Sequence, residues 1–391
     1  MSRRPVEHYV NPEPFNPHSV LELTPEQERY YMASQWRLAW WKLKRHRLAV
    51  ISASFLTLMY LVVIFAEAVA PYDLEERHTR YLFAPPQELH FFDDGEFVGP
   101  FVYGIEVSLD MENLRWVYGE DRTQRHPLRF FCSGNDYPGA GYRFWGLVEG
   151  SFHLVCPSQD GQLFLLGTDR LGRDMLSRII YGARISLTLG LIGITISFFL
   201  GITIGGVAGY YGGMVDTVVQ RVIEIIRSFP MLPLLMTLSA ILPVTWPPTL
   251  IFIGITVLLA LLDWPGLARA VRSKLLALRE EDFCVAAQLM GAKPGRVIMK
   301  HLMPSFVSHL IASATLSIPT MILGETALSF LGLGLRPPVT SWGVLLNEAQ
   351  NINYVVLYPW LLYPVIPVIL VVLAYQFLGD GLLDAADPYK H

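Results

Sequence analysis

Long apolar segments with few charges recur along the chain. The three longest cover residues 48–70, 185–208 and 355–378, and together they hold a single charged residue, Glu67. At about 1.5 Å per residue, each is long enough for a helix across about 30 Å of hydrocarbon. Isolated strands are excluded, because an open strand edge in lipid leaves backbone groups unpaired. The pattern therefore predicts membrane-spanning helices.

Three weaker apolar segments raise the predicted number of spans to six. They cover residues 218–242, 249–262 and 306–324, and prolines or polar residues interrupt or end them. The chain is 52% hydrophobic and 16% charged, with a mean hydropathy of +0.37. We therefore expect an α-helical polytopic membrane protein. The net charge of −4 is too small to indicate a nucleic-acid partner.

Basic residues predict the orientation of the spans. Residues 37–47 are rich in Lys and Arg, contain no acid and directly precede the first span, which places the N-terminus in the cytoplasm. Six crossings return the C-terminus to that side and make residues 264–305 a cytoplasmic loop. The arginines before the second span disagree with this orientation. We keep it, because the first span usually dominates and Asp169 and Asp174 offset part of the charge.

The predicted organisation has five parts. Residues 1–47 form a cytoplasmic segment, 48–70 the first span and 71–165 an extracytoplasmic inserted domain; residues 166–380 form a core with five further spans, and 381–391 a cytoplasmic tail. Thr24-Pro25-Glu26-Gln27 resembles a helix capping box, and aromatic and basic residues follow it. This pattern predicts an amphipathic helix on the membrane surface, with an ordinary surface helix as the alternative. The polar start lacks a removable signal peptide, so the first span is expected to stay in the membrane.

The inserted segment is acidic and rich in aromatic residues. Short alternating runs with Gly and Pro turns predict β structure there. Cys132 and Cys156 both lie in it and are candidates for a disulfide, with two buried free thiols as the alternative. No Cys or His spacing indicates a metal site. We expect the insert either to contact an outer binding protein or its cargo, or to brace a partner subunit.

Three blocks of sequence carry a resemblance to a known family. They are LGTDRLGRDMLSRIIYGARISL at residues 166–187, a basic loop at 279–304, and ETALSFLGLG at 325–334 followed by Ser341-Trp342-Gly343. Together they resemble the C-type permeases of dipeptide and oligopeptide ATP-binding-cassette (ABC) importers. The long insert before Leu166 resembles the Yej-type branch, which is associated with peptides and the peptide-like antibiotic microcin C.

The basic loop resembles the coupling loop that docks into a separate ATPase. The resemblance implies a short helix at residues 286–290 with Gly291 as its cap, and a second helix from Pro294. The family's glutamate is Val285 here, and nearby Glu281 is the candidate substitute. A plain basic cytoplasmic loop is the alternative. The coupling residues implied are Glu281, Ala286, Ala287, Gly291, His301 and Pro304.

The block after the fifth span is expected at the outer mouth of the pathway. It would form a gate or contact the binding protein, with a purely structural re-entrant turn as the alternative. Its candidate residues are Glu325, Ser329, Phe330, Pro337 and Trp342. Separately, Gly201, Gly205 and Gly209 recur every four residues, which predicts close helix packing.

The resemblance implies a type I importer fold and a permease subunit for peptides or microcin C-type compounds, working by alternating access in the bacterial inner membrane. The implied partners are a homologous permease, ABC ATPase subunits, an extracytoplasmic solute-binding protein and a peptide substrate. The chain lacks a G-x-x-x-x-G-K-[ST] phosphate loop, so we expect no catalytic site, cofactor or metal on it, and ATP and Mg on the partner ATPase. The alternatives are a permease for another solute such as nickel chelates, a secondary transporter, or a membrane sensor.

Overall fold

The computed structural model describes residues 32–386 except 94, 113–114, 134–140, 157, 159–160 and 244. Within this part, five helices are long and apolar enough to cross a membrane. They are α3 (Arg47–Ile64), α5 (Met175–Tyr211), α8 (Pro248–Leu278), most of α11 (Met303–Phe330), and α14 (Val365–Ala386) with the preceding 3-10 turn η3 (Pro359–Leu362). Five of the six predicted spans are thereby confirmed as suitable helices.

The fourth predicted segment becomes a broken pair of helices. α6 (Gly213–Ser228) and α7 (Met231–Ser239) meet at an angle of 87°. Phe229 adopts an extended backbone conformation directly before Pro230, which is the conformation that proline favours in the residue it follows. The described chain therefore has six candidate crossings only if this bent pair counts as one.

Two predicted boundaries are wrong. We expected the span starting near residue 249 to stop before Asp263, but α8 continues to Leu278, and within it the Asp263 carboxylate accepts a hydrogen bond from Ser197 Oγ at 2.8 Å. The last span was expected from residue 355. Instead α13 (Ile352–Leu357) ends before Pro359, and α14 begins after Pro364 and runs through Ala386, past the predicted core boundary at 380.

The predicted surface helix is described only in its second half. The Thr24–Gln27 capping box lies outside the described residues, and α2 (Gln35–Arg45) directly precedes α3. The Lys44 ammonium lies 5.1 Å from the Trp40 ring, and the Arg37 guanidinium lies 5.1 Å from the Trp41 ring. This mixture of tryptophan and basic side chains suits a membrane interface.

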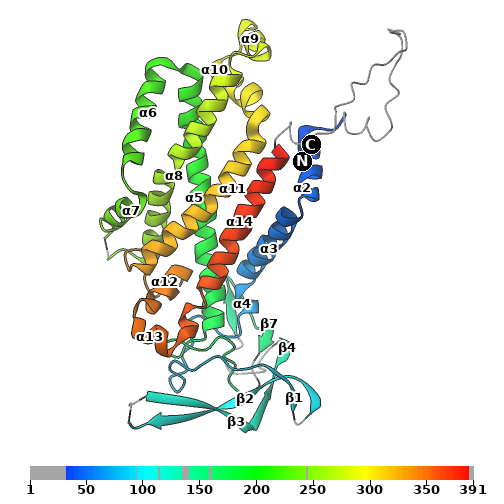
Figure 1. The fold of residues 1–391 in the computed structure, drawn as a ribbon, viewed down its shortest axis with the longest axis vertical. Coiled ribbons are helices and arrows are strands. Elements are labelled where there is room, and N and C mark those ends of the chain that lie inside the picture. The colour runs from blue at the N-terminus through cyan, green and yellow to red at the C-terminus, as the bar shows by residue number, and fades with distance from the viewer. Residues whose placement is uncertain are drawn as a thin grey trace, which may run out of the picture.

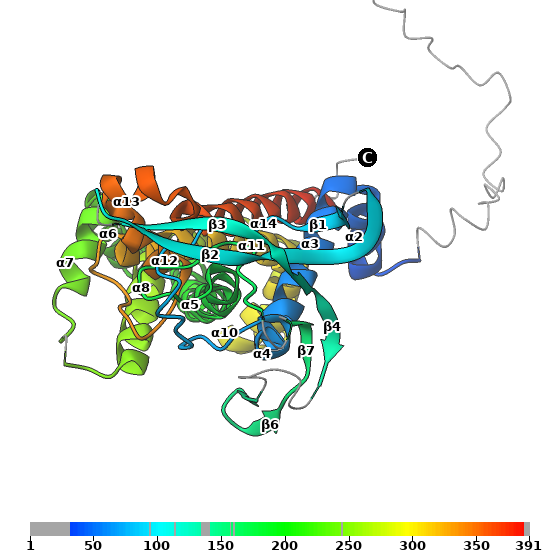
Figure 2. The same ribbon diagram turned by 90° about the horizontal axis from the view of Figure 1, so that it is seen from below.

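The inserted segment has the predicted β structure. All the described strands lie between the short helix α4 (Ala66–Val69) and α5, and every pair is antiparallel. The main sheet has the order β1-β2-β3, and two small sheets pair β4 with β7 and β5 with β6. Figure 2 shows β2 and β3 lying across the ends of the helices. The strands are β1 (His90–Asp93), β2 (Glu96–Asp110), β3 (Arg115–Pro127), β4 (Arg129–Cys132), β5 (Tyr142–Phe144), β6 (Val148–Gly150) and β7 (His153–Cys156).

The cysteine pair joins two of these strands. Cys132 in β4 and Cys156 in β7 are bonded as a disulfide, with their Cα atoms 6.5 Å apart. Cys284, far along the chain, is a buried free thiol. The structure thus contains the pairing expected for an oxidising compartment.

Close helix packing occurs at the predicted glycines. A Cβ added at Gly205 would overlap the backbone of Ala268 in α8, and one at Gly201 would lie 2.8 Å from Leu267 Cβ. A Cβ added at Gly209 would likewise lie 3.0 Å from Arg272 Cα. The glycine stripe therefore fits α5 directly against α8, as small residues do in membrane helices.

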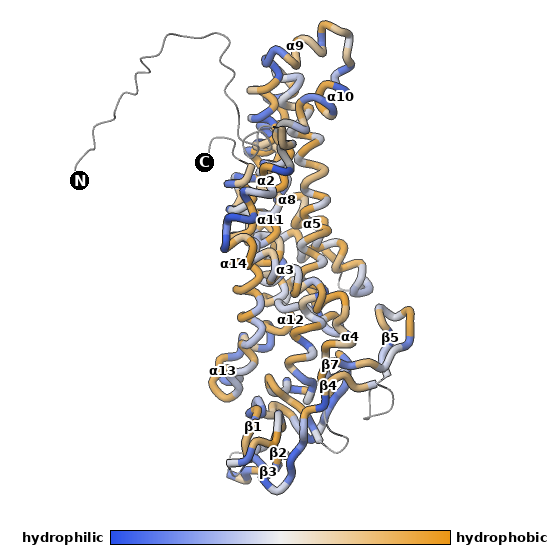
Figure 3. Tube along the Cα trace, turned by 90° about the vertical axis from the view of Figure 1, so that its right-hand side faces the viewer, coloured by the Kyte–Doolittle hydropathy of each residue, from blue (hydrophilic) through white to orange (hydrophobic). Residues whose placement is uncertain are grey.

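The helices and the strands occupy different parts of the molecule. Figure 1 shows α9 (Asp282–Leu289) at one end of the helices and β1–β3 at the other, with α2 and the end of α14 toward the α9 end. Figure 3 shows hydrophobic residues along the helices between these two ends. The molecule is therefore an apolar bundle with α9 at one end and the strands at the other.

Candidate functional sites

The first candidate site is α9, which lies at the tip of the molecule between α8 and α11 (Figure 1). Cys284 and Ala287 face inward and are buried; Cys284 belongs to a cluster with Leu275 and Val297. The other face carries exposed apolar side chains: Phe283, Val285, Leu289 and, just after the helix, Met290. The exposed fractions of Leu289 and Met290 are 84% and 81%, so their apolar surfaces are uncovered in the single chain.

The turn after α9 has the predicted glycine geometry. Gly291 adopts a φ of +80°, in the left-handed region, directly after the helix cap at Met290. Pro294 then begins α10 (Pro294–Arg296), as expected. The chain continues through a π-helical turn (Val297–Leu302) into α11, so a four-residue turn and a continuous helical segment join α9 to a transmembrane helix.

The predicted coupling residues differ in how exposed their side chains are. Glu281 and Ala286 are exposed, and Glu281 occupies the N-cap of α9 without a side-chain capping bond. Ala287 is only 2% exposed and packs inward. His301 is half-buried in the π-helical turn, and Pro304 is exposed in the first turn of α11. α9 begins four residues earlier than the helix predicted from residue 286.

The second candidate site is a buried polar cluster around Glu325 in α11. Its carboxylate accepts hydrogen bonds from Ser341 Oγ at 2.6 Å, Ser329 Oγ at 2.8 Å and Ser186 Oγ at 3.2 Å. All four residues are at most 1% exposed. Three hydroxyl donors satisfy the oxygens of a carboxyl group that would otherwise be costly to bury.

The cluster also fixes the chain that follows α11. Ser341 Oγ accepts from Val344 N at 3.2 Å and so caps the short helix α12 (Trp342–Asn347). Trp342 is fully buried, and its indole Nε1 donates to Ile179 O at 3.1 Å. The cluster therefore ties α11 and α12 to the first half of α5.

The structure separates the predicted outer-gate residues. It brings Glu325, Ser329 and Trp342 together in this buried cluster, whereas Phe330 and Pro337 lie exposed outside it. In this conformation, only the two exposed residues could touch another protein directly. Sequence reasoning missed Ser186. This residue lies 139 positions before Glu325, and nothing around it in the sequence indicates that its hydroxyl donates a hydrogen bond to Glu325.

A third feature is a buried charge network where α5 begins. Asp169 accepts from Arg173 Nε at 2.7 Å and also pairs with Arg178, whose guanidinium lies 3.4 Å from Glu348. Asp169 and Arg178 are at most 1% exposed. The network joins the entry to α5 with the 3-10 turn η2 (Glu348–Gln350).

Asp174 caps α5 and does not join this charge network. Its Oδ2 accepts from Ser177 N and Oγ, both at 2.7 Å, while its buried Oδ1 has no hydrogen-bond partner. Burial raises the pKa of this carboxyl to about 7 despite the two bonds from Ser177. The expectation that Asp174 offsets neighbouring arginines is therefore corrected, whereas Asp169 does pair with them.

Comparison with known proteins identifies the family of the chain. Residues 201–390 match the model of the binding-protein-dependent transport system inner membrane component, and residues 34–86 match the N-terminal transmembrane domain of oligopeptide transport permease C. The dipeptide transport system permease protein DppC of Alkalihalophilus pseudofirmus is 30% identical over 380 residues, covering 97% of this chain and 96% of that protein. The chain belongs to the binding-protein-dependent transport permeases.

Other similarities are partial. DppC of Bacillus subtilis is 40% identical over 224 residues, covering 57% of this chain and 68% of that protein. A solved structure described as an inward-facing conformation of the MetNI methionine ABC transporter covers 55% of this chain and 98% of that one, with 21% identity and a TM-score of 0.44. The expected importer fold therefore rests on membership of the permease family and not on that structural likeness. The permease is a multi-pass membrane protein.

Arg184, the arginine directly before the apolar segment at residues 185–208, forms an ion pair in the permease. Arg184 in α5 donates to both oxygens of Glu67, at 2.8 and 2.6 Å, and its guanidinium lies 4.2 Å from the Trp145 ring. Trp145 N also donates to Glu67 at 3.0 Å. Burial alone would raise the pKa of Glu67, but these donors lower it. Glu67 is thus a paired structural charge that links the first two long helices to the insert.

Two further contacts made by charged side chains of the permease were not predicted from the sequence. Asp216 in α6 forms a two-pronged ion pair with Arg272 in α8. Asp263, half-buried in α8, accepts a hydrogen bond from Ser197 Oγ of α5. Both partners are remote in sequence, so the spacing of charges within a segment could not reveal them.

Proposed function

We propose that this chain is the permease subunit of an ATP-driven importer for dipeptides and other short peptides. The observation that carries this proposal is the similarity to a permease named for dipeptide transport over 97% of the chain, a share that includes the inserted segment. A second relative, the oligopeptide permease OppC of Haemophilus influenzae, is 39% identical over 235 residues, covering 60% of this chain and 73% of that protein. Short peptides are the substrate class common to both names.

The ATP-hydrolysing site lies on another chain in this proposal, and α9 is the element that contacts it. The buried face of α9 is held by α8 and by the helix that continues into α11. α11 then runs from Met303 to Glu325, a length of about 33 Å at 1.5 Å per residue. A push on α9 would therefore reach the buried cluster through packed helices, as a rigid-body transition requires.

Orientation follows from the same arrangement. We propose that α9, α2 and the end of α14 face the cytoplasm and that the strands face outward. The positions of these elements at opposite ends support this (Figure 1), as does a disulfide in the strand region. The exposed Phe330 and Pro337 and the strands are then available to a solute-binding protein, and a homologous permease would complete the pathway. Bracing that partner permease remains the competing role for the insert.

The narrower proposal, a Yej-type permease for microcin C, has weaker support. It rests on the long insert before Leu166, and the full-length dipeptide relative aligns across that region as well. We therefore treat sensitivity to microcin C as an outcome of the test. Nickel chelates are the alternative solute, and a secondary transporter is the alternative mechanism.

Uptake in a strain that lacks this chain tests the proposal. Cells with and without the gene would be supplied with a radiolabelled dipeptide and, separately, with radioactive nickel. We expect deletion to abolish dipeptide uptake and leave nickel accumulation unchanged. Restoration should require both this chain and an ATPase subunit with a phosphate loop.

Two outcomes would contradict the proposal. Normal dipeptide uptake with a loss of nickel would identify the alternative solute. Dipeptide uptake that continues after every partner ATPase has been removed would indicate a secondary transporter. Loss of microcin C sensitivity together with dipeptide uptake would add the narrower substrate.

A further inference from the structure

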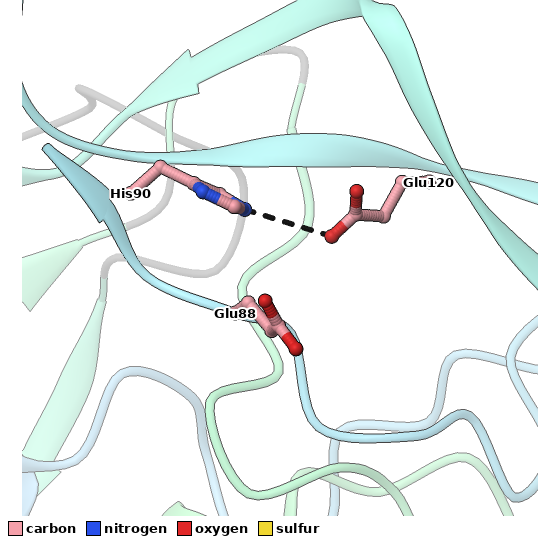
Figure 4. A group of neighbouring side chains, drawn as sticks. All are labelled: Glu88, His90 and Glu120. Atoms are coloured by element: carbon pink, nitrogen blue, oxygen red, sulfur yellow. Dashed lines mark ion pairs between the residues drawn. The ribbon is translucent and has the colours of Figure 1, made fainter. Parts of the chain in front are cut away.

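Three side chains of metal-ligand type meet on the main sheet of the insert. Figure 4 shows His90 and Glu120 facing each other, with Glu88 beside them. One ligand atom from each lies within 4.8 Å of the other two, and His90 Nε2 lies 3.5 Å from Glu120 Oε1. Neither the coupling helix nor the buried Glu325 cluster uses these residues.

The sheet brings these residues together from separate segments. His90 in β1 is paired with Phe101 of β2, and Glu120 in β3 is paired with Ile105 of β2. Cross-strand partners share a face of a sheet, so His90 and Glu120 approach each other over the central strand. Glu88 lies two residues before β1 and completes the group from its edge.

His90 Nε2 makes no hydrogen bond in the described chain, and the ion-pair contact with Glu120 Oε1 is at 3.5 Å. Its Nε2 atom is buried without a hydrogen-bond partner, although the side chain as a whole is 25% exposed. A buried polar atom without a partner is costly, which favours a ligand at that position. The rings of Tyr103 and Phe101 lie 4.8 and 5.6 Å from the imidazole and restrict its orientation.

The Arg122 guanidinium does not occupy the space beside this nitrogen. Arg122 Nε lies 3.5 Å from Glu120 Oε2, on the other oxygen of the carboxylate, and the Arg122 side chain is 77% exposed. Glu120 Oε1 remains directed at His90. The group therefore has two carboxylates and an imidazole close together.

We propose that Glu88, His90 and Glu120 bind one divalent transition-metal ion, with Zn²⁺ as the best match. Zinc binds imidazole nitrogen and carboxylate oxygen at about 2.0–2.2 Å, which places tetrahedral ligand atoms about 3.3–3.6 Å apart. The His90–Glu120 separation of 3.5 Å already has this value. Glu88 is exposed and closes the remaining gap by a rotamer change.

The site leaves a coordination position open. A cavity of about 150 Å³ lies beside it, lined among others by Glu88, Tyr103, Tyr118 and Glu120. Three protein ligands and one free position is the arrangement that admits water or an outside carboxylate, unlike a closed structural zinc site. Imidazole disfavours Ca²⁺ and Mg²⁺, which prefer oxygen ligands alone. This proposal does not depend on the transported substrate.

Metal titration of the tag-free, full-length chain in detergent tests the site. After treatment with a chelator, the protein would be titrated calorimetrically with Zn²⁺ and, separately, with Ca²⁺. We expect one Zn²⁺ per chain and no saturable Ca²⁺ binding. His90→Ala should weaken Zn²⁺ binding by at least about 100-fold, because removing even an outer-sphere partner costs about 10–100-fold.

Glu88→Gln supplies a second variant, since Glu88 is exposed and lies outside the strands. Its matched control is Glu106→Gln, which removes the same charge from an exposed position on β2. We expect weaker binding only for Glu88→Gln, and X-ray absorption of the bound zinc should show one imidazole. Absence of saturable Zn²⁺ binding, unchanged affinity in His90→Ala, or equal losses in both glutamate variants would overturn the proposal.

Discussion

At the scale of single residues, the buried polar groups hold the ends of the long helices in place. Glu325, Ser329 and Trp342 could be singled out from the sequence, because they stand in a block that resembles the peptide permeases. Their association with Ser186 could not, since a hydroxyl in a transmembrane helix carries no sign of its partner. The same limit applies to Glu67, which was visible as a charge in an apolar segment but not as the partner of Arg184.

Ser341→Ala tests the Glu325 cluster. The change removes a hydrogen bond to Glu325 and the cap of α12, so we expect a loss of about 1–3 kcal/mol in the free energy of unfolding. The measurement is the apparent melting temperature of the purified chain in detergent. Ser54→Ala is the control, because its exposed hydroxyl bonds only to the carbonyl of its own helix. Equal melting temperatures of the two variants would show that the cluster contributes nothing to stability.

Asp174 should make stability depend on pH. Its folded pKa of about 7 lies above the usual 3.8, so between these values the unfolded chain releases a proton that the folded chain retains. This contribution therefore lowers stability as pH rises from about 4 to about 7. Asp174→Asn keeps a side-chain oxygen for the cap but cannot ionise, and its melting temperature should fall less between pH 5 and pH 8 than that of the wild type. Parallel melting curves for both proteins would mean that Asp174 does not titrate in this range.

At the scale of elements, hydrophobic length predicted the long helices well and their ends poorly. α8 passes Asp263, whose carboxylate accepts a hydrogen bond from Ser197, and α14 starts late because Pro359 and Pro364 withhold backbone donors. α9 was expected on its family resemblance and is present, but the resemblance could not say which alanine faces inward. The spacing of residues shows which alanine faces inward only when the start of the helix is known. The start of α9 was predicted four residues too late.

Ala286 and Ala287 give opposite expectations for the coupling helix. Ala286→Glu places a charge on the exposed face of α9, so we expect loss of dipeptide uptake with a normal amount of chain in the membrane. Ala287→Glu places it in the buried face, so the amount of chain itself should fall. Immunoblots of membranes beside uptake assays separate the two effects. If Ala286→Glu transports normally, this face of α9 does not contact the ATPase.

Neighbouring glycines in α5 test its packing against α8. Gly205→Ala would press a methyl group into the backbone of Ala268, whereas at Gly206 the nearest atom, Leu275 Cδ1, is 3.9 Å from the added carbon. We expect Gly205→Ala to cost about 1–3 kcal/mol and Gly206→Ala to be neutral or slightly stabilising. Melting temperatures in detergent compare the pair. A Gly206→Ala variant as unstable as Gly205→Ala would point to helix flexibility instead of close packing.

At the scale of the whole molecule, the account depends on α9 and the strands lying on opposite sides of a membrane. The sequence predicted this separation from basic residues, and the arginines before the apolar segment at residues 185–208 were its main difficulty. Arg173, Arg178 and Arg184 all pair with carboxylates in the folded chain, so they do not act as free positive charges. Asp169 is close in sequence and was named as an offsetting charge, whereas Glu67 and Glu348 come from remote segments that no counting of nearby charges could identify.

The most direct test of the central claim is thiol labelling at both ends of the molecule. Leu289→Cys in α9 is 84% exposed and Met111→Cys beside β2 is 73% exposed, while the native thiols are buried or bonded. With a membrane-impermeant maleimide, we expect spheroplasts to label Met111→Cys alone and inverted vesicles to label Leu289→Cys alone. Adding the partner ATPase should protect Leu289→Cys. Labelling of Leu289→Cys in intact spheroplasts, or unchanged labelling after the ATPase is added, would contradict the account.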